Sequence, residues 1–168
     1  MEVQTPKIVL ALDIGLKRIG VAKAIQNIAL PLPPILRKNR NQAAKEISQL
    51  LLDSKANVLV VGIPMQKRDS ALTDEDSLAT MQKRIRHFVS LLTIPPHLEI
   101  IFLDESFSSF EALQKLEDKK SRKKAHSKDG SLDSLAALVI LERYLINFDR
   151  IPQSNSKDEN NDKQSTRN

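Results

Sequence analysis

Residues 7–24 read KIVLALDIGLKRIGVAKA, and this stretch decides the fold because it predicts a β-hairpin. Lys7–Leu12 is a short apolar run rich in strand-forming residues. Gly15 permits a turn, after which Arg18–Ala24 reads as a second strand. The next stretch, Ile28–Leu36, contains three prolines. Because proline cannot donate a hydrogen bond to a neighbouring strand, this third stretch suits the edge of a sheet.

Helices and strands alternate along the rest of the chain. Asn41 is a candidate cap for a helix whose apolar residues recur at helical spacing. Val58–Gly62 (VLVVG) is a continuous apolar run, typical of a strand buried on both faces. A second amphipathic helix is expected between Asp74 and the proline pair at 95–96, and Glu99–Leu103 is the last expected strand.

A strongly apolar helix is expected over Leu132–Ile146, and the chain after residue 150 is polar. The order of these segments predicts one α/β domain, with a mixed five-stranded sheet flanked by helices, over residues 1–150. Residues 151–168 have too few apolar side chains to form a core, so they are expected to be a disordered tail.

The composition narrows the chemistry. The 168 residues contain no cysteine and only three histidines, so a thiolate zinc site and a cysteine nucleophile are excluded. A bound metal would need oxygen ligands, which favours Mg²⁺, with Mn²⁺ as the other candidate. The net charge of +5 suggests a polyanionic partner such as nucleic acid. No signal segment or membrane-spanning run is visible, so a cytoplasmic protein without a membrane partner is expected.

Three carboxylates stand at the ends of predicted strands or at the start of a helix. Asp13 follows the first strand, Glu105 follows the last strand, and Asp133 lies early in the final helix, on its apolar side. Sites in α/β sheets form at the carboxyl ends of strands. If folding gathers these three acids, they would repel one another unless a cation lies between them. They are therefore the predicted catalytic and metal-binding residues.

Each of these acids also has a simpler explanation. An aspartate after a strand is often a turn former, which applies to Asp13. Glu105 could simply begin a loop, and Asp133 could interact with the helix dipole. Only their combination on three segments that can converge favours a site.

Basic residues near these acids could bind a nucleic-acid backbone. Lys17 and Arg18 lie in the turn after Asp13, although they could equally be a solvated hairpin tip. A denser basic run, which includes Arg122, Lys123 and Lys124, precedes the final helix. Aromatic residues make up only 4% of the chain, so recognition by stacking on bases is poorly supported.

These motifs together resemble the YqgF/RuvX family of Holliday junction resolvase-like proteins and pre-16S rRNA nucleases. The segment LDIGLKRIGVA at 12–22 is similar to the first-strand signature of that family, and VVGIP at 60–64 is similar to its second signature. Asp104–Glu105 occupies the place of its Asp-Glu-Arg motif, and Asp133–Leu141 resembles its C-terminal helix. The match covers residues 7 to 147.

The resemblance implies a ribonuclease-H-like fold and Mg²⁺-dependent hydrolysis of phosphodiester bonds, with Asp13, Glu105 and Asp133 as the catalytic acids. Two departures bear on activity. Ser106 replaces the arginine that normally follows Asp-Glu and is itself followed by Phe107, and the loop after Pro64 lacks the usual glycine pair. A missing arginine weakens substrate positioning more than metal binding.

The main expectation is a nuclease that processes the 5′ end of precursor 16S rRNA in ribosome biogenesis. The alternatives are a resolvase of branched DNA in recombination and repair, or an RNA-binding module with weak or no catalysis. A sugar-kinase or actin-like ATPase is disfavoured because the chain has four glycines and no second phosphate loop. The sequence leaves open whether the protein is a monomer or a homodimer.

Overall fold

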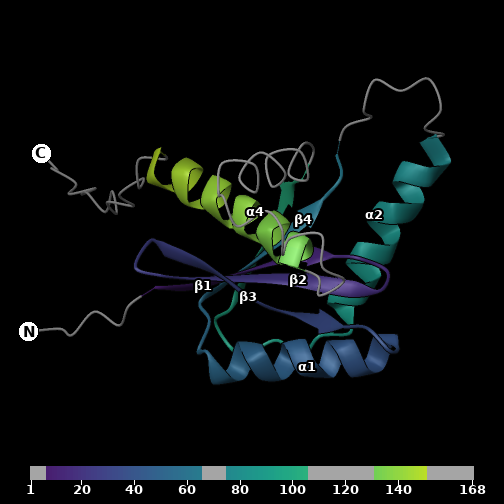
Figure 1. Cartoon of the computed structure of the whole chain (residues 1–168), viewed down its shortest axis with the longest axis horizontal. Helices are drawn as coiled ribbons and strands as arrows, with labels where there is room; N and C mark the ends of the chain where they lie inside the picture. The colour runs from purple at the N-terminus through teal and green to yellow at the C-terminus, as the bar shows by residue number, and fades with distance from the viewer. Residues whose placement is uncertain (1–6, 66–74, 106–130, 151–168) are drawn as a thin grey trace, which may run out of the picture.

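The computed structural model describes residues 7–65, 75–105 and 131–150 of the chain. Five strands and three helices follow one another in these residues (Figure 1). The strands are β1 (Ile8–Ile14), β2 (Arg18–Ile25), β3 (Ile28–Leu36), β4 (Val58–Ile63) and β5 (Glu99–Asp104). The helices are α1 (Arg40–Asp53), α2 (Glu75–Ser90) and α4 (Ser131–Arg150).

The strands form one mixed sheet in the order β3-β2-β1-β4-β5. β1, β2 and β3 pair as antiparallel neighbours, whereas β4 runs parallel to both β1 and β5. The predicted hairpin is confirmed, and so is the edge position of the proline-rich strand β3. The predicted mixed five-stranded sheet is confirmed as well.

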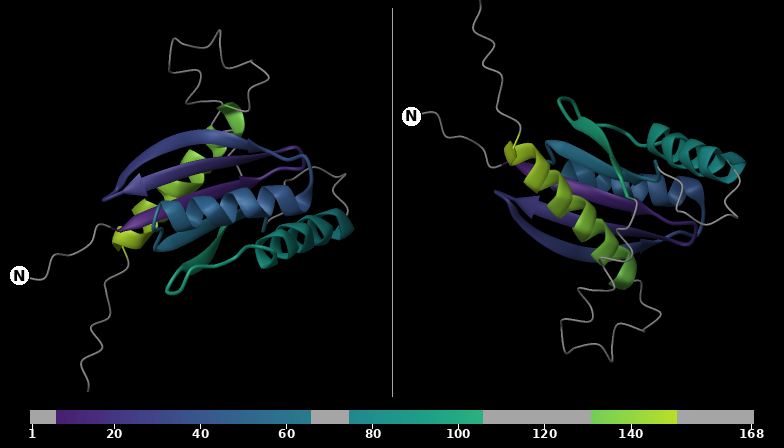
Figure 2. Two further views of the ribbon diagram at one scale, coloured as in Figure 1. Left: turned by 90° about the horizontal axis from the view of Figure 1, so that it is seen from below. Right: turned by 90° about the horizontal axis from the view of Figure 1, so that it is seen from above.

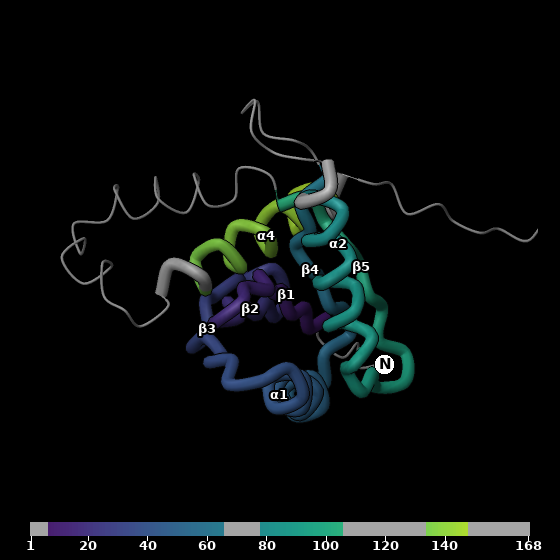
Figure 3. Tube along the Cα trace, turned by 90° about the vertical axis from the view of Figure 1, so that its right-hand side faces the viewer, coloured from purple at the N-terminus to yellow at the C-terminus, as the bar shows by residue number. Residues whose placement is uncertain are grey.

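The two faces of the sheet are covered by different helices (Figure 2, Figure 3). Side chains alternate between the faces along each strand. In β1, Leu10 and Leu12 join the apolar cluster that contains the buried residues of α1 and α2. Val9 and Ala11 point the other way and join the cluster formed with α4. β1 is therefore the centre of both halves of the core.

β4 is buried along its whole length, as its unbroken apolar sequence predicts. Leu59 and Val61 of β4 pack in the cluster with α1 and α2, and Val58 and Val60 pack in the cluster with α4. Like β1 beside it, β4 therefore lies in the middle of the molecule. The sheet therefore has a rigid parallel centre made of β1 and β4.

The start of α1 differs from the expectation. The residue that caps α1 is Asn39 rather than Asn41. The Asn39 side chain accepts a hydrogen bond from the Gln42 backbone N–H at 2.8 Å, and the Gln42 side chain accepts one from the Asn39 N–H at 3.3 Å. This reciprocal pair needs a glutamine or glutamate three residues after the cap, and only Asn39 meets that requirement.

The end of α2 also differs. The helix stops at Ser90, before the proline pair that was expected to end it. Its residues Ile85, Phe88 and Val89 are buried, whereas Met81, one turn before Ile85, is 50% exposed. No helix in the described part of the chain is long and apolar enough to cross a membrane.

Candidate active site

The parallel strands β1, β4 and β5 end at the same edge of the sheet, and two predicted site residues lie there. Asp13 is the penultimate residue of β1, and Glu105 directly follows β5. The Glu105 backbone N–H donates to the Ile63 carbonyl oxygen of β4 at 3.1 Å, which fixes the backbone of Glu105 at this edge. Both acidic residues are half-buried.

Asp13 and Glu105 belong to the same face of the sheet. Asp13 follows Leu12, which packs toward α1 and α2, so the alternation along the strand directs Asp13 to the opposite face, toward α4. Glu105 lies two residues after Leu103, which packs in the cluster formed with α4. The two carboxylates are therefore on the α4 face, whereas Asp104 occupies the alternate position.

Gly62 of β4 provides the space between these acids. A Cβ atom at Gly62 would lie 2.9 Å from Glu105 Oε2 and 3.2 Å from Glu105 Cβ, and it would also collide with Ile140 Cδ1 of α4. The Glu105 side chain therefore lies over Gly62 of β4, the strand between β5 and β1. The register pairs Leu12 of β1 with Val61 of β4. Asp13 and Gly62 are the next residues along these two parallel strands, so they lie at the same level of the sheet.

The role of Gly62 was missed from the sequence. Its signal was visible as the only residue without a side chain in the apolar run of β4, where glycine often marks a close approach. Gly62 lets one carboxylate extend over the neighbouring strand toward another.

The backbone of Asp133 lies in the first turn of α4. The next residue, Ser134, donates from Oγ to the Leu32 carbonyl oxygen of β3 at 2.7 Å. Leu32 pairs with Val21, and Val21 pairs with Leu12, the residue before Asp13. The start of α4 is thus on the β3 side of Asp13, while Glu105 is on the β5 side. The side chain of Asp133 lies outside the described part of the structure.

The donor set fits a hard divalent cation. Asp13 and Glu105 offer carboxylate oxygens from one face of the sheet, and such oxygens are the ligands that Mg²⁺ and Mn²⁺ prefer. Among the described side chains, no group of three or more histidine, cysteine, aspartate or glutamate residues could hold a metal. The two acids could therefore supply only part of the ligand set of a metal ion.

The predicted basic residues divide into two sets. Lys17 is exposed in the β1–β2 turn and Arg18 is half-buried at the start of β2, both at the same sheet edge as Asp13. The turn depends on Gly15, whose N–H donates to the Arg18 carbonyl oxygen at 3.0 Å and whose Cβ, if present, would lie 2.5 Å from that oxygen. Arg122, Lys123 and Lys124 lie outside the described residues, as do Ser106 and Phe107.

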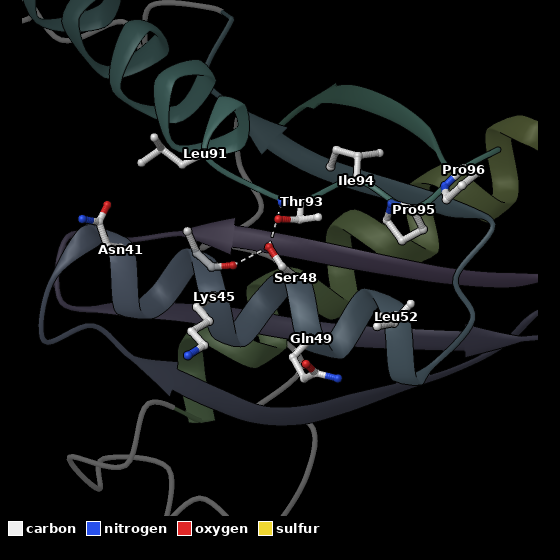
Figure 4. A pocket seen from close by; sticks show the side chains of 11 residues that line it. Asn41, Lys45, Ser48, Gln49, Leu52, Leu91, Thr93, Ile94, Pro95 and Pro96 are labelled. Atoms are coloured by element: carbon white, nitrogen blue, oxygen red, sulfur yellow. Dashed lines mark hydrogen bonds between the residues drawn. The ribbon is translucent and has the colours of Figure 1, made fainter.

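A cavity of about 550 Å³ lies between α1 and the segment that joins α2 to β5 (Figure 4). The Ser48 hydroxyl accepts a hydrogen bond from the Thr93 N–H at 2.9 Å and donates to the Ala44 carbonyl oxygen at 2.7 Å, which ties the two segments together. Pro95 and Pro96, which precede β5, also line it. Since β5 begins at the end of the sheet opposite the acids, this cavity is separate from them.

Comparison with known proteins places this chain among relatives of one family. Residues 7–147 match the family model of RuvX, described as a Holliday junction resolvase. A Helicobacter hepaticus protein named "Putative pre-16S rRNA nuclease" is 48% identical over 138 residues, which cover 82% of this chain and 94% of that protein. A Campylobacter lari protein of the same name is 48% identical over 136 residues, covering 80% of this chain and 94% of that protein.

A solved structure shares the fold. The RuvC protein of T. thermophilus, in complex with a Holliday junction substrate, superposes with a TM-score of 0.51 at 13% identity. The superposition covers 84% of this chain and 96% of RuvC. The shared architecture is that of the ribonuclease-H-like fold, as expected from the sequence.

Replacing Gly62 with alanine tests whether the glycine holds the acids in position. Gly62→Ala is expected to lower the free energy of unfolding by about 1–3 kcal/mol because the new methyl group overlaps Ile140 and Glu105. It should also weaken Mn²⁺ binding because Glu105 must move. Urea denaturation and Mn²⁺ titration measure the two effects.

The double variant Gly62→Ala/Ile140→Val is the matched control. Valine lacks the Cδ1 atom that the alanine would meet, so stability should partly recover, while the conflict with Glu105 and the weak Mn²⁺ binding should persist. If Gly62→Ala binds Mn²⁺ as tightly as the wild type, the glycine has no part in arranging the acids.

Proposed function

Because this chain belongs to the RuvX family, we propose that it is a divalent-metal-dependent nuclease that trims the 5′ end of precursor 16S rRNA. The single observation that carries the proposal is the placement of Asp13 and Glu105 on one face of the sheet, with the Glu105 carboxylate over Gly62. Relatives 48% identical to this chain carry a name with that substrate, which supports the choice of RNA. The protein thereby acts in ribosome biogenesis, in the cytoplasm.

Asp13, Glu105 and Asp133 would hold Mg²⁺, with Mn²⁺ as a substitute. The bound ion would supply an activated water and stabilise the charge that develops as the phosphodiester bond is cleaved. Asp13 contributes a carboxylate from β1, whose central place in the core restricts its movement. Glu105 contributes a second one from the end of β5, and its backbone hydrogen bond to Ile63 restricts it in the same way.

The basic residues of the β1–β2 turn would orient the substrate. Lys17 and Arg18 are at the same edge as Asp13, and their positive charges can meet phosphate oxygens next to the scissile bond. Arg122, Lys123 and Lys124 are proposed to extend this contact along the backbone. An arginine can form two parallel hydrogen bonds with one phosphate, which favours a fixed orientation.

A second candidate function is resolution of branched DNA. It is favoured by the description of the family as a Holliday junction resolvase. The same carboxylates would serve both reactions, so the substrate must be decided by experiment.

Cleavage assays test both the catalytic acids and the substrate. With Mg²⁺, the wild type is expected to shorten a precursor 16S rRNA fragment faster than it cuts a four-way DNA junction. Asp13→Asn should reduce the rate at least about 100-fold, since loss of a ligand exceeds the 10- to 100-fold effects of residues that support metal ligands. Denaturing gels of end-labelled substrates measure the rates.

Asp53→Asn is the charge-matched control. Asp53 is exposed on α1 and accepts a hydrogen bond from Gln49 through Oδ1 at 2.7 Å, a bond that asparagine can keep. Its activity should equal that of the wild type. Full activity in Asp13→Asn would refute the assignment, and faster cleavage of the junction would select the second function.

Metal-dependent stability separates a nuclease from a passive RNA-binding module. At a Mg²⁺ concentration about 100 times its Kd, binding would stabilise the fold by about 2.7 kcal/mol, which raises the Tm of a chain of this size by about 5–10 °C. Glu105→Gln should remove this rise, while Asp53→Asn keeps it. If Mg²⁺ does not change the Tm of the wild type, the RNA-binding module is favoured.

A further inference from the structure

A second cavity, which we call the basic cavity, opens at the same edge of the sheet as Asp13. It has a volume of about 900 Å³ and lies between the β1–β2 turn, the junction of β3 and α1, and the exposed side of α2. Four positive residues line it: Arg37, Arg40, Lys83 and Arg84. None of the described residues that line it is acidic. The basic cavity is therefore an anion-attracting surface outside the carboxylate site.

Arg37 is the fixed member of this set. Its Nη1 donates to the Gly15 carbonyl oxygen at 2.8 Å, and its guanidinium carbon lies 5.0 Å from the centre of the Phe88 ring. The Arg37 backbone N–H also donates to the Lys17 carbonyl oxygen at 2.8 Å. The side chain is thus held against the β1–β2 turn, with little freedom left to lose when a ligand binds.

The positive charges around the basic cavity repel one another. Partial burial, and then the nearby charge of Arg40, lower the pKa of Arg37. Arg40, Lys83 and Arg84 are exposed. An anion between these like charges would lower their mutual repulsion, and a phosphate group matches the paired donors of arginine.

The position of the basic cavity connects it to the acids. Ile14 and Gly15 line the cavity, and the residue before them is Asp13. Successive residues of a strand face opposite sides, so the cavity and the acids lie on either side of the β1–β2 turn. Leu16, at the tip of this turn, is 74% exposed and also lines the cavity, where it offers an apolar contact for a sugar or base.

We propose that the basic cavity binds a backbone phosphate of the nucleic-acid substrate, so that the strand passes over the β1–β2 turn between the cavity and the carboxylate site. This inference rests on the proposed nuclease function, which it extends with a substrate contact on the far face of the sheet. Arg37 is the fixed donor, and Arg40, Lys83 and Arg84 supply the surrounding charge. Phosphate contacts of this kind release counterions, so they make binding depend on salt.

The salt dependence of binding tests the proposal. Fluorescence anisotropy with a labelled precursor rRNA stem, and in parallel a labelled four-way DNA junction, gives Kd over a range of KCl concentrations, with Ca²⁺ replacing Mg²⁺ to prevent cleavage. Arg40→Gln/Arg84→Gln should weaken binding about 10-fold or more and lower the slope of log Kd against log[KCl] by about 1.5, from two lost contacts at about 0.7–0.9 each. Arg37 is left intact because it also supports the turn.

Lys45→Gln/Lys55→Gln is the matched control. It removes the same charge from exposed residues of α1 and its C-terminal end, outside the basic cavity. It should leave the slope unchanged. Equal slopes for the two double variants, or no binding of either probe by the wild type, would overturn the proposal.

The cleavage assay keeps the two proposals apart. If the Arg40→Gln/Arg84→Gln slope falls as expected but the wild type cuts neither substrate, the basic cavity stands and the nuclease function fails. If the wild type cuts its substrate and the slope does not change, the nuclease function stands and the basic cavity is refuted.

Discussion

The parallel pairing of β1, β4 and β5 is the constraint on which the rest of the structure depends. Backbone hydrogen bonds keep these strands in register, from Val9 with Val58 to Ile63 with Asp104. Because parallel strands share a direction, their carboxyl ends meet at one edge of the sheet. Burial on both faces prevents a shift of register, since a slip of one residue would turn every apolar side chain to the wrong face. The positions of Asp13 and Glu105 follow from this pairing.

The second requirement is room for two like charges beside an apolar layer. Gly62 provides that room, since any side chain there would meet Glu105 on one side and Ile140 on the other. Partly buried carboxylates repel one another more strongly than exposed ones, because less water screens them. A divalent cation reverses the sign of that interaction. The proposed site therefore combines a rigid sheet edge with two carboxylates on one face, where a divalent cation would be favourable, and positive residues lie around the nearby turn.

Local patterns predicted most of the fold. The unbroken apolar run of β4 marked a strand buried on both faces, and the prolines of β3 marked an edge, because each pattern reflects a property of its own residues. The same reasoning placed Asp13 and Glu105 at strand ends. Features assembled from distant segments were not predictable in this way. Gly62 contacts a residue more than forty positions away, and the basic cavity joins a turn, a strand end and the outside of a helix. The roles of all the predicted site residues stay predictions: Asp13, Glu105 and Asp133 as catalytic metal ligands, and Lys17, Arg18, Arg122, Lys123 and Lys124 as nucleic-acid contacts.

We infer that Asp13 and Glu105 are ligands of the same ion, and locating that ion is the most direct test. Crystals of the full chain grown with Mn²⁺ would show the ion by its anomalous scattering. We expect a strong peak on the α4 face of the sheet, with an oxygen of Asp13 and one of Glu105 both coordinated to it. A peak bound to only one of these acids, or a Mn²⁺-saturated crystal with no peak at this edge, would show that the two acids do not share an ion.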